Sequence, residues 1–140
     1  MYMVLGTADE SGIPWVTPVY FGHREYREFY WISSPDVRHS HNIAVRTQVS
    51  IVVFDSQVRA GQGQAVYMSA IAQELTGADF DRGLEVYNGR FSNPADHGVS
   101  VIKAEDVQAS GLYRLYRAVA SEHWVLDPAV RPDHRIPLNI

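Results

Sequence analysis

The chain has 140 residues, of which 46% are hydrophobic and 20% charged, and it carries a net charge of −4 at pH 7 with no cysteine. We expect residues 1–140 to form one globular domain without disulfides, thiol nucleophiles or thiolate metal sites. The acidic balance argues against a nucleic-acid partner. No apolar run approaches the ~18 residues of a membrane helix and no signal peptide is visible, so a cytoplasmic protein with no membrane partner is expected.

Two strands are predicted at the start of the chain, at residues 3–7 and 13–21, joined by a turn at residues 8–12. Pro18 lies inside the second strand. Because proline donates no hydrogen bond to a neighbouring strand, it predicts an edge, a bulge or a place where a ligand replaces that strand.

A third strand is expected at residues 28–33, after a charged connection at residues 22–27, with a helix directly behind it. Ser34 is of the type that caps helix N-termini. Pro35 suits the first helical position, because its missing N–H costs nothing there. The pattern predicts that the helix begins where the strand ends.

Such a helix start presents unpaired N–H groups and the positive end of the helix dipole. Ser33, Arg38 and His39 are close to it in sequence, and their hydroxyl and cationic groups are suited to binding a phosphate. Asp36 would repel a phosphate. The alternative interpretation is a capped connecting helix with Arg38 and His39 facing water. His41 follows His39 at a spacing that diverges on a helix, so no metal site is expected.

The rest of the chain is predicted from apolar patterns and turn residues. We expect strands at 48–56, 65–75 and 111–126, a helix at 78–89, an irregular or helical piece at 93–103 and a short helical turn at 104–107. Six mostly antiparallel strands with helix after the third predict a mainly β domain with α, a small Greek-key barrel with helices at its ends.

The segment ISSPDVRHSHNIAVRTQVSIVVF, residues 32–54, resembles the flavin-phosphate segment of the pyridoxamine 5'-phosphate oxidase-like flavoproteins, split β-barrels that bind FMN. In that family a strand ends in a hydroxyl residue, an Arg followed by a Lys comes five residues later, and a helix leads to an apolar strand. Ser33 and Arg38 match this pattern. His39 departs from it, because a neutral imidazole brings no full charge. The resemblance implies an FMN-binding split barrel of six antiparallel strands.

The resemblance also implies which residues hold the cofactor. Strand two would face the flavin, Gln64 would bind the ring edge, and Trp124 would reach the flavin of the partner subunit. The alternative interpretations are that Gln64 is a polar residue at the end of a loop and that Trp124 packs in the core or at an interface. The full expected set is Thr17, Pro18, Val19, Ile32, Ser33, Ser34, Arg38, His39, Gln64 and Trp124.

The function implied is a homodimeric flavoprotein with FMN sites at the subunit interface. It would be an oxidoreductase that exchanges electrons with a small-molecule donor or acceptor, and no catalytic side chain is identified. Residues 17–22 contain no basic residue, which argues against pyridoxamine phosphate as substrate. The alternatives are a deazaflavin-dependent reductase and a non-catalytic flavin-binding or storage protein. Relatives commonly have a helix before the first strand, which is absent here or precedes Met1. The tail at 131–140 is expected near the dimer interface.

Overall fold

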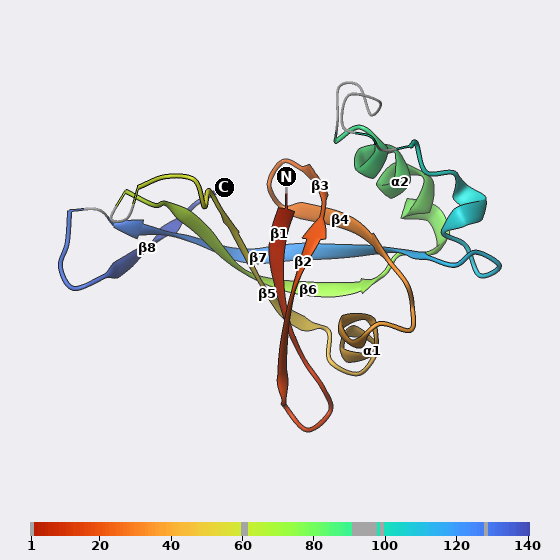
Figure 1. The fold of residues 1–140 in the computed structure, drawn as a ribbon, viewed down its shortest axis with the longest axis horizontal. Coiled ribbons are helices and arrows are strands. Elements are labelled where there is room, and N and C mark those ends of the chain that lie inside the picture. Colours follow the sequence, from red (N-terminus) through yellow and green to blue (C-terminus); the bar gives the residue numbers. More distant parts are fainter. Residues whose placement is uncertain (1, 60–61, 91–97, 99, 128) are drawn as a thin grey trace.

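The computed structural model describes residues 2–59, 62–90, 98, 100–127 and 129–140 (Figure 1). Within them, the chain forms one antiparallel sheet, two α-helices (α1 and α2) and two short 3-10 helices (η1 and η3). The elements are β1 (Tyr2–Ala8), β2 (Pro14–Tyr20), β3 (Gly22–Arg24), β4 (Glu28–Ser33), α1 (Arg38–Val45), β5 (Gln48–Phe54), β6 (Ala65–Glu74), η1 (Gly77–Asp79), α2 (Phe80–Asn88), η3 (Ala104–Asp106), β7 (Arg114–Asp127) and β8 (His134–Leu138).

The sheet runs in the order β2-β1-β5-β6-β7-β4-β3, and β8 pairs with β7. It curls so that β2 comes into contact with β4, although the two are not hydrogen-bonded neighbours. Alternate side chains point into the curl, and Met3, Leu5 and Ile51 are completely buried there. The mainly β split barrel predicted from the sequence is therefore confirmed.

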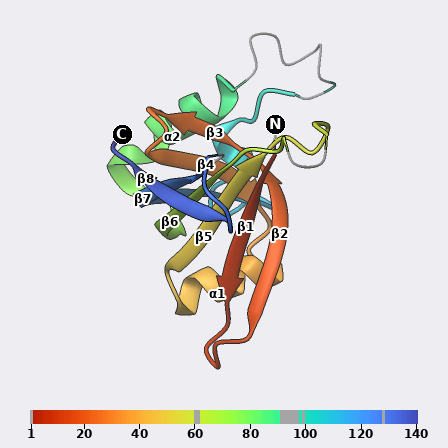
Figure 2. The ribbon, with the colours of Figure 1, turned by 90° about the vertical axis from the view of Figure 1, so that its left-hand side faces the viewer.

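The two helices cover different parts of the sheet (Figures 1 and 2). Helix α1 contacts β1, β2 and β6, and its Ile43 belongs to the barrel core. Helix α2 contacts β3, β4 and β7 and buries a second cluster that includes Tyr30 and Leu84. Gly83 lets α2 lie close to the sheet, because a Cβ there would collide with Tyr30. None of the helices described is long and apolar enough to cross a bilayer.

The described residues form eight strands rather than the six predicted. Strand β3 falls in the segment expected as a connection, and β8 in the segment expected as a tail. The turn between β3 and β4 places Glu25 and Tyr26 at φ of 51° and 55°. Gly, Asn or Asp usually takes this conformation, so the local sequence lacks the hairpin signal.

Helix α1 begins later than predicted. Its first residue is Arg38, and Val37 occupies the N-cap position without a side-chain cap. Ser34 is therefore not the N-cap, and Pro35 is not helical. The hydroxyl of Ser34 accepts the N–H of Asp36 at 3.2 Å, and this local hydrogen bond stabilises a turn in place of helix.

The other predicted elements agree with the structure to within a few residues, including the short helical turn at η3. Parts of the predicted piece at 93–103 and of the loop before β6 lie outside the described residues.

One row of side chains crosses the outer face of the sheet. Val4 lies between the buried Met3 and Leu5 and so points outward. Successive register partners of Val4 share that face. We call the set the outer row, and it comprises Pro18, Val4, Val52, Tyr67, Trp124 and Pro137.

The outer row has exposed apolar neighbours at the β1 and β5 end, and the guanidinium of Arg135 lies over the ring of Tyr67, 4.4 Å from its centroid. Tyr2 and Phe54 are each 52% exposed, and Tyr2 stacks on Tyr20 with 3.9 Å between ring centroids. This face of the sheet is thus both apolar and open, a combination that monomers rarely leave over a large area.

Candidate functional site

Two of the predicted phosphate-binding residues, Ser33 and His39, are in contact at the end of β4. Ser33 closes the strand, and its hydroxyl shares a 2.8 Å hydrogen bond with Nε2 of His39 in α1. His39 is only 7% exposed, and this burial lowers its pKa below the usual value for histidine. The imidazole is therefore neutral at pH 7 and does not supply the charge that a lysine would bring to this position.

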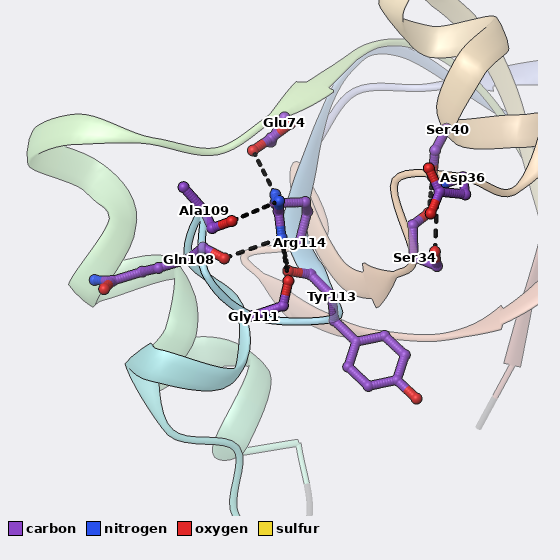
Figure 3. Close-up of polar contacts among 9 residues, drawn as sticks. All are labelled: Ser34, Asp36, Ser40, Glu74, Gln108, Ala109, Gly111, Tyr113 and Arg114. Carbon is purple, nitrogen blue, oxygen red and sulfur yellow. Dashed lines mark hydrogen bonds and ion pairs between the residues drawn. The ribbon is translucent and has the colours of Figure 1, made fainter.

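Ser34 lies in the turn between β4 and α1 (Figure 3). Its hydroxyl accepts the N–H of Asp36, and its carbonyl accepts the hydroxyl of Ser40 at 2.8 Å. Both polar groups of Ser34 are thus engaged within the chain. Ser34 therefore shapes the turn that leads into α1, where His39 lies beside Ser33.

Arg38 is the exposed cation of this corner. Its side chain is 46% exposed, and its Cζ lies 4.8 Å from the ring centroid of Trp15. One guanidinium nitrogen, Nη2, lies 4.0 Å from Oδ2 of Asp9. Neither Trp15 nor Asp9 was identified from the sequence. Both come from the β1–β2 hairpin, which is distant in sequence from α1.

A second arginine lies close by, but its guanidinium is bound to other groups of the chain. Arg114 is the register partner of Ser33. Its guanidinium donates to the carbonyls of Gln108, Ala109, Gly111 and Tyr113 and forms an ion pair with Glu74 at 3.5 Å (Figure 3). Arg114 therefore orders the loop before β7, whereas Arg38 keeps much of its surface open to a ligand.

A cavity of about 930 Å³ opens beside the outer row. Its wall is mostly apolar and includes Tyr2, Val4, Pro18 and Phe54, and Gln64 also lines it. This size and this mixture of surfaces are typical of a site for a small organic ligand. Pro18 and Gln64, predicted from separate segments, are thus brought to one cavity.

Other predicted residues lie elsewhere. Val19 is buried in the barrel core, so its side chain cannot touch a ligand at the surface. Ile32 packs against the cluster beneath α2. Thr17 is half-buried on the inner side of β2, opposite Leu5. Trp124 is half-buried in the outer row, between Tyr67 and Pro137.

The candidate residues fall into two groups, which we name the polar corner (Ser33, Arg38, His39) and the apolar cavity (Pro18, Gln64). Ser33 pairs with Arg114 at one end of β7, and Trp124 lies ten residues later in the same strand. That separation corresponds to about 30 Å of extended strand. In one protomer, Ser33 and Trp124 are too far apart to contact the same cofactor.

The comparisons agree with this fold. The family model described as pyridoxamine 5'-phosphate oxidase matches residues 1–113. No curated protein matches the chain.

Several solved structures are similar to the chain. They include a heme binding protein from Mycobacterium smegmatis (TM-score 0.71, 12% identity, 97% of this chain and 52% of that one). Another is the heme storage protein HutZ from Vibrio cholerae (0.65, 21%, 86% and 81%). A third is a Listeria innocua protein provisionally described as a pyridoxamine 5'-phosphate oxidase (0.62, 10%, 89% and 86%). The chain spans about half the length of the mycobacterial protein. At these identities the similarity shows a shared fold.

Proposed function

The chain belongs to the pyridoxamine 5'-phosphate oxidase family, and we propose that it is a flavin-binding protein that holds FMN noncovalently between two copies of itself. The observation that carries this proposal is the meeting of Pro18 and Gln64 at one large apolar cavity. A flat aromatic ring buries its faces against apolar side chains. An amide offers both a donor and an acceptor to the polar edge of such a ring.

The polar corner is suited to the other end of FMN. Arg38 can donate charge-assisted hydrogen bonds to a phosphate, and the first N–H groups of α1 lie beside it. The hydroxyl of Ser33 lies at the same corner, held by His39. These groups are suited to binding a phosphate. Because His39 is neutral, Arg38 would be the cation that binds it.

A second copy would join the two groups. Because about 30 Å of strand separates Ser33 from Trp124 within one chain, the polar corner of one copy would face Gln64 and Trp124 of the other. The outer row and its exposed neighbours Tyr2 and Phe54 offer an apolar face for a symmetric contact. The homodimer and the shared cofactor site are therefore proposed together.

Binding is better supported than catalysis. Among the described residues that line the cavity, Asp55 and Tyr2 are the ionisable ones, and neither Lys, Arg nor His is present. The cavity wall therefore offers no second phosphate site for pyridoxamine phosphate. A bound flavin would supply hydride or electron transfer, while the chain would supply position and environment. A flavin-dependent oxidoreductase that uses a small-molecule electron donor or acceptor is the second candidate, supported by the family.

Heme is the competing cofactor. Two of the similar structures are described as heme binding or heme storage proteins, and an apolar cavity beside an aromatic row also suits a porphyrin. Cofactor identity is therefore the first property to measure.

The test is titration of the purified chain with FMN, riboflavin, a deazaflavin and hemin, followed by absorbance and calorimetry. We expect FMN to bind more tightly than riboflavin, and light scattering to report a dimer. Tight hemin binding with no flavin binding would overturn the proposal. If FMN binds, the protein with bound FMN is photoreduced and its reoxidation by candidate acceptors is measured. A non-catalytic flavin-binding protein should be reoxidised no faster than free flavin, whereas an oxidoreductase should be reoxidised faster by its acceptor.

A further inference from the structure

The tip of the β1–β2 hairpin is tied to both ends of α1. Just past the end of the helix, Arg46 donates from Nε to the carbonyl of Asp9 and from Nη2 to the carbonyl of Glu10, each at 3.3 Å. At the start of the helix, Nη2 of Arg38 lies 4.0 Å from Oδ2 of Asp9. Asp9 therefore lies beside the cation that would bind the cofactor phosphate.

The carboxylate of Asp9 is held in place by the turn. Its Oδ1 accepts the N–H of Ser11 at 3.0 Å and the N–H of Ile13 at 2.9 Å. Because Oδ1 is fixed in this way, the direction of Oδ2 is set by the hairpin rather than by a freely rotating side chain. The negative charge is thus held beside Arg38.

Trp15 holds Arg38 from another side. The guanidinium carbon lies 4.8 Å from the Trp15 ring centroid, a position that favours a cation–π contact. A cation–π contact uses no N–H hydrogen bond to an oxygen, so the guanidinium N–H groups can still bind an anion. A phosphate would therefore compete with Asp9 for Arg38 and leave the contact with Trp15 in place.

We infer that Asp9 is an internal counter-ion of Arg38 and that the phosphate of a bound cofactor displaces it. Two negative groups beside one guanidinium repel each other, so Asp9 lowers the affinity for a phosphate and leaves the affinity for the ring unchanged. Asp9 would then set how strongly the chain prefers FMN over riboflavin. The identity of the ligand rests on the proposed function, whereas the competition rests on the contacts of Asp9.

The variant Asp9→Asn isolates the charge. Its amide oxygen can still accept the N–H groups of Ser11 and Ile13, and the negative charge is gone. The matched control is Glu10→Gln, which loses the same charge at the next residue. Among the described residues, the Glu10 carboxylate forms no ion pair.

The experiment measures the dissociation constants of FMN, riboflavin and inorganic phosphate for the wild type and both variants. Phosphate binding is followed by tryptophan fluorescence. The part of the signal that comes from Trp15 is identified as the part that the variant Trp15→Phe lacks. In Asp9→Asn we expect about fivefold tighter binding of FMN and of inorganic phosphate, since exposed pairs contribute up to about 1 kcal/mol. Riboflavin affinity should not change, and Glu10→Gln should match the wild type.

The outcomes separate the two proposals. Unchanged or weaker binding of phosphate and FMN in Asp9→Asn would overturn the role of Asp9. An equal gain in riboflavin affinity would also overturn it, and so would a wild-type protein whose fluorescence does not respond to phosphate. If no protein binds a flavin, the proposed function fails. The phosphate titration then still decides whether Asp9 competes for Arg38.

Discussion

The polar corner and the apolar cavity use their side chains in opposite ways. At the polar corner, Ser33 and His39 bind each other, and Arg38 already has two neighbours within the chain. At the apolar cavity, Tyr2 and Phe54 each remain about half exposed, Tyr2 while stacked on Tyr20. The polar corner is thus closed by contacts within one chain, whereas the apolar cavity keeps much of its aromatic surface exposed.

The largest expected effect comes from a charge on the apolar face. We expect Phe54→Glu to abolish dimerisation and cofactor binding together, because a carboxylate at the centre of an apolar contact would lose its water. Light scattering and FMN titration measure the two losses. The matched control is Val45→Glu, at an exposed position on α1, which should behave as wild type. A dimer that survives Phe54→Glu would place the interface elsewhere.

The next effect tests the polar corner. Arg38→Ala should weaken FMN binding by roughly 1–3 kcal/mol, the usual contribution of a hydrogen bond to a charged group, and leave riboflavin binding unchanged. Calorimetric titration of both ligands checks it. Arg82→Ala removes the same charge from an arginine paired with Asp79 and is expected to have no effect. Equal losses for FMN and riboflavin would show that Arg38 supports the fold rather than the phosphate.

A smaller effect tests the cavity. Gln64→Ala should weaken FMN and riboflavin by the same amount, about 1 kcal/mol, because both carry the same ring and the variant removes a neutral hydrogen-bonding group. Gln73→Ala, an exposed amide on β6, is the control. A loss confined to FMN would mean that Gln64 contacts the phosphate, and the two groups would no longer be distinct.

The smallest effect concerns pH. Burial lowers the pKa of His39 in the folded chain, so below pH ~6.5 the unfolded chain takes up a proton that the folded chain resists. The free energy of unfolding should therefore fall as the pH drops from 6.5 toward the lowered pKa of His39. Above pH 6.5, the stabilising contribution of the neutral His39 should be fully present. Denaturant titrations at several pH values, compared with His39→Gln, measure it. An identical pH dependence in the variant would exclude His39 as the cause.

Much of the fold could be predicted because its signals are local. Strand β4 was predicted with its observed bounds, since apolar and aromatic residues end at a Ser-Pro turn. The start of α1 was predicted at Pro35 with Ser34 as the N-cap, because the sequence could not show that the hydroxyl of Ser34 closes a turn onto Asp36. Strand β3 was missed because Glu25 and Tyr26 adopt positive φ without a residue that favours it.

The sequence by itself determined a mainly β barrel and placed Ser33, Arg38 and His39 on one strand-to-helix connection, because these residues lie within seven positions of one another. Only the tertiary structure decided that His39 is buried, that Asp9 and Trp15 lie against Arg38, and that Ser33 and Trp124 lie far apart along β7. These facts depend on which distant segments the curled sheet places side by side. Contacts between distant segments are set by the packing of the whole chain and cannot be predicted from a local sequence pattern.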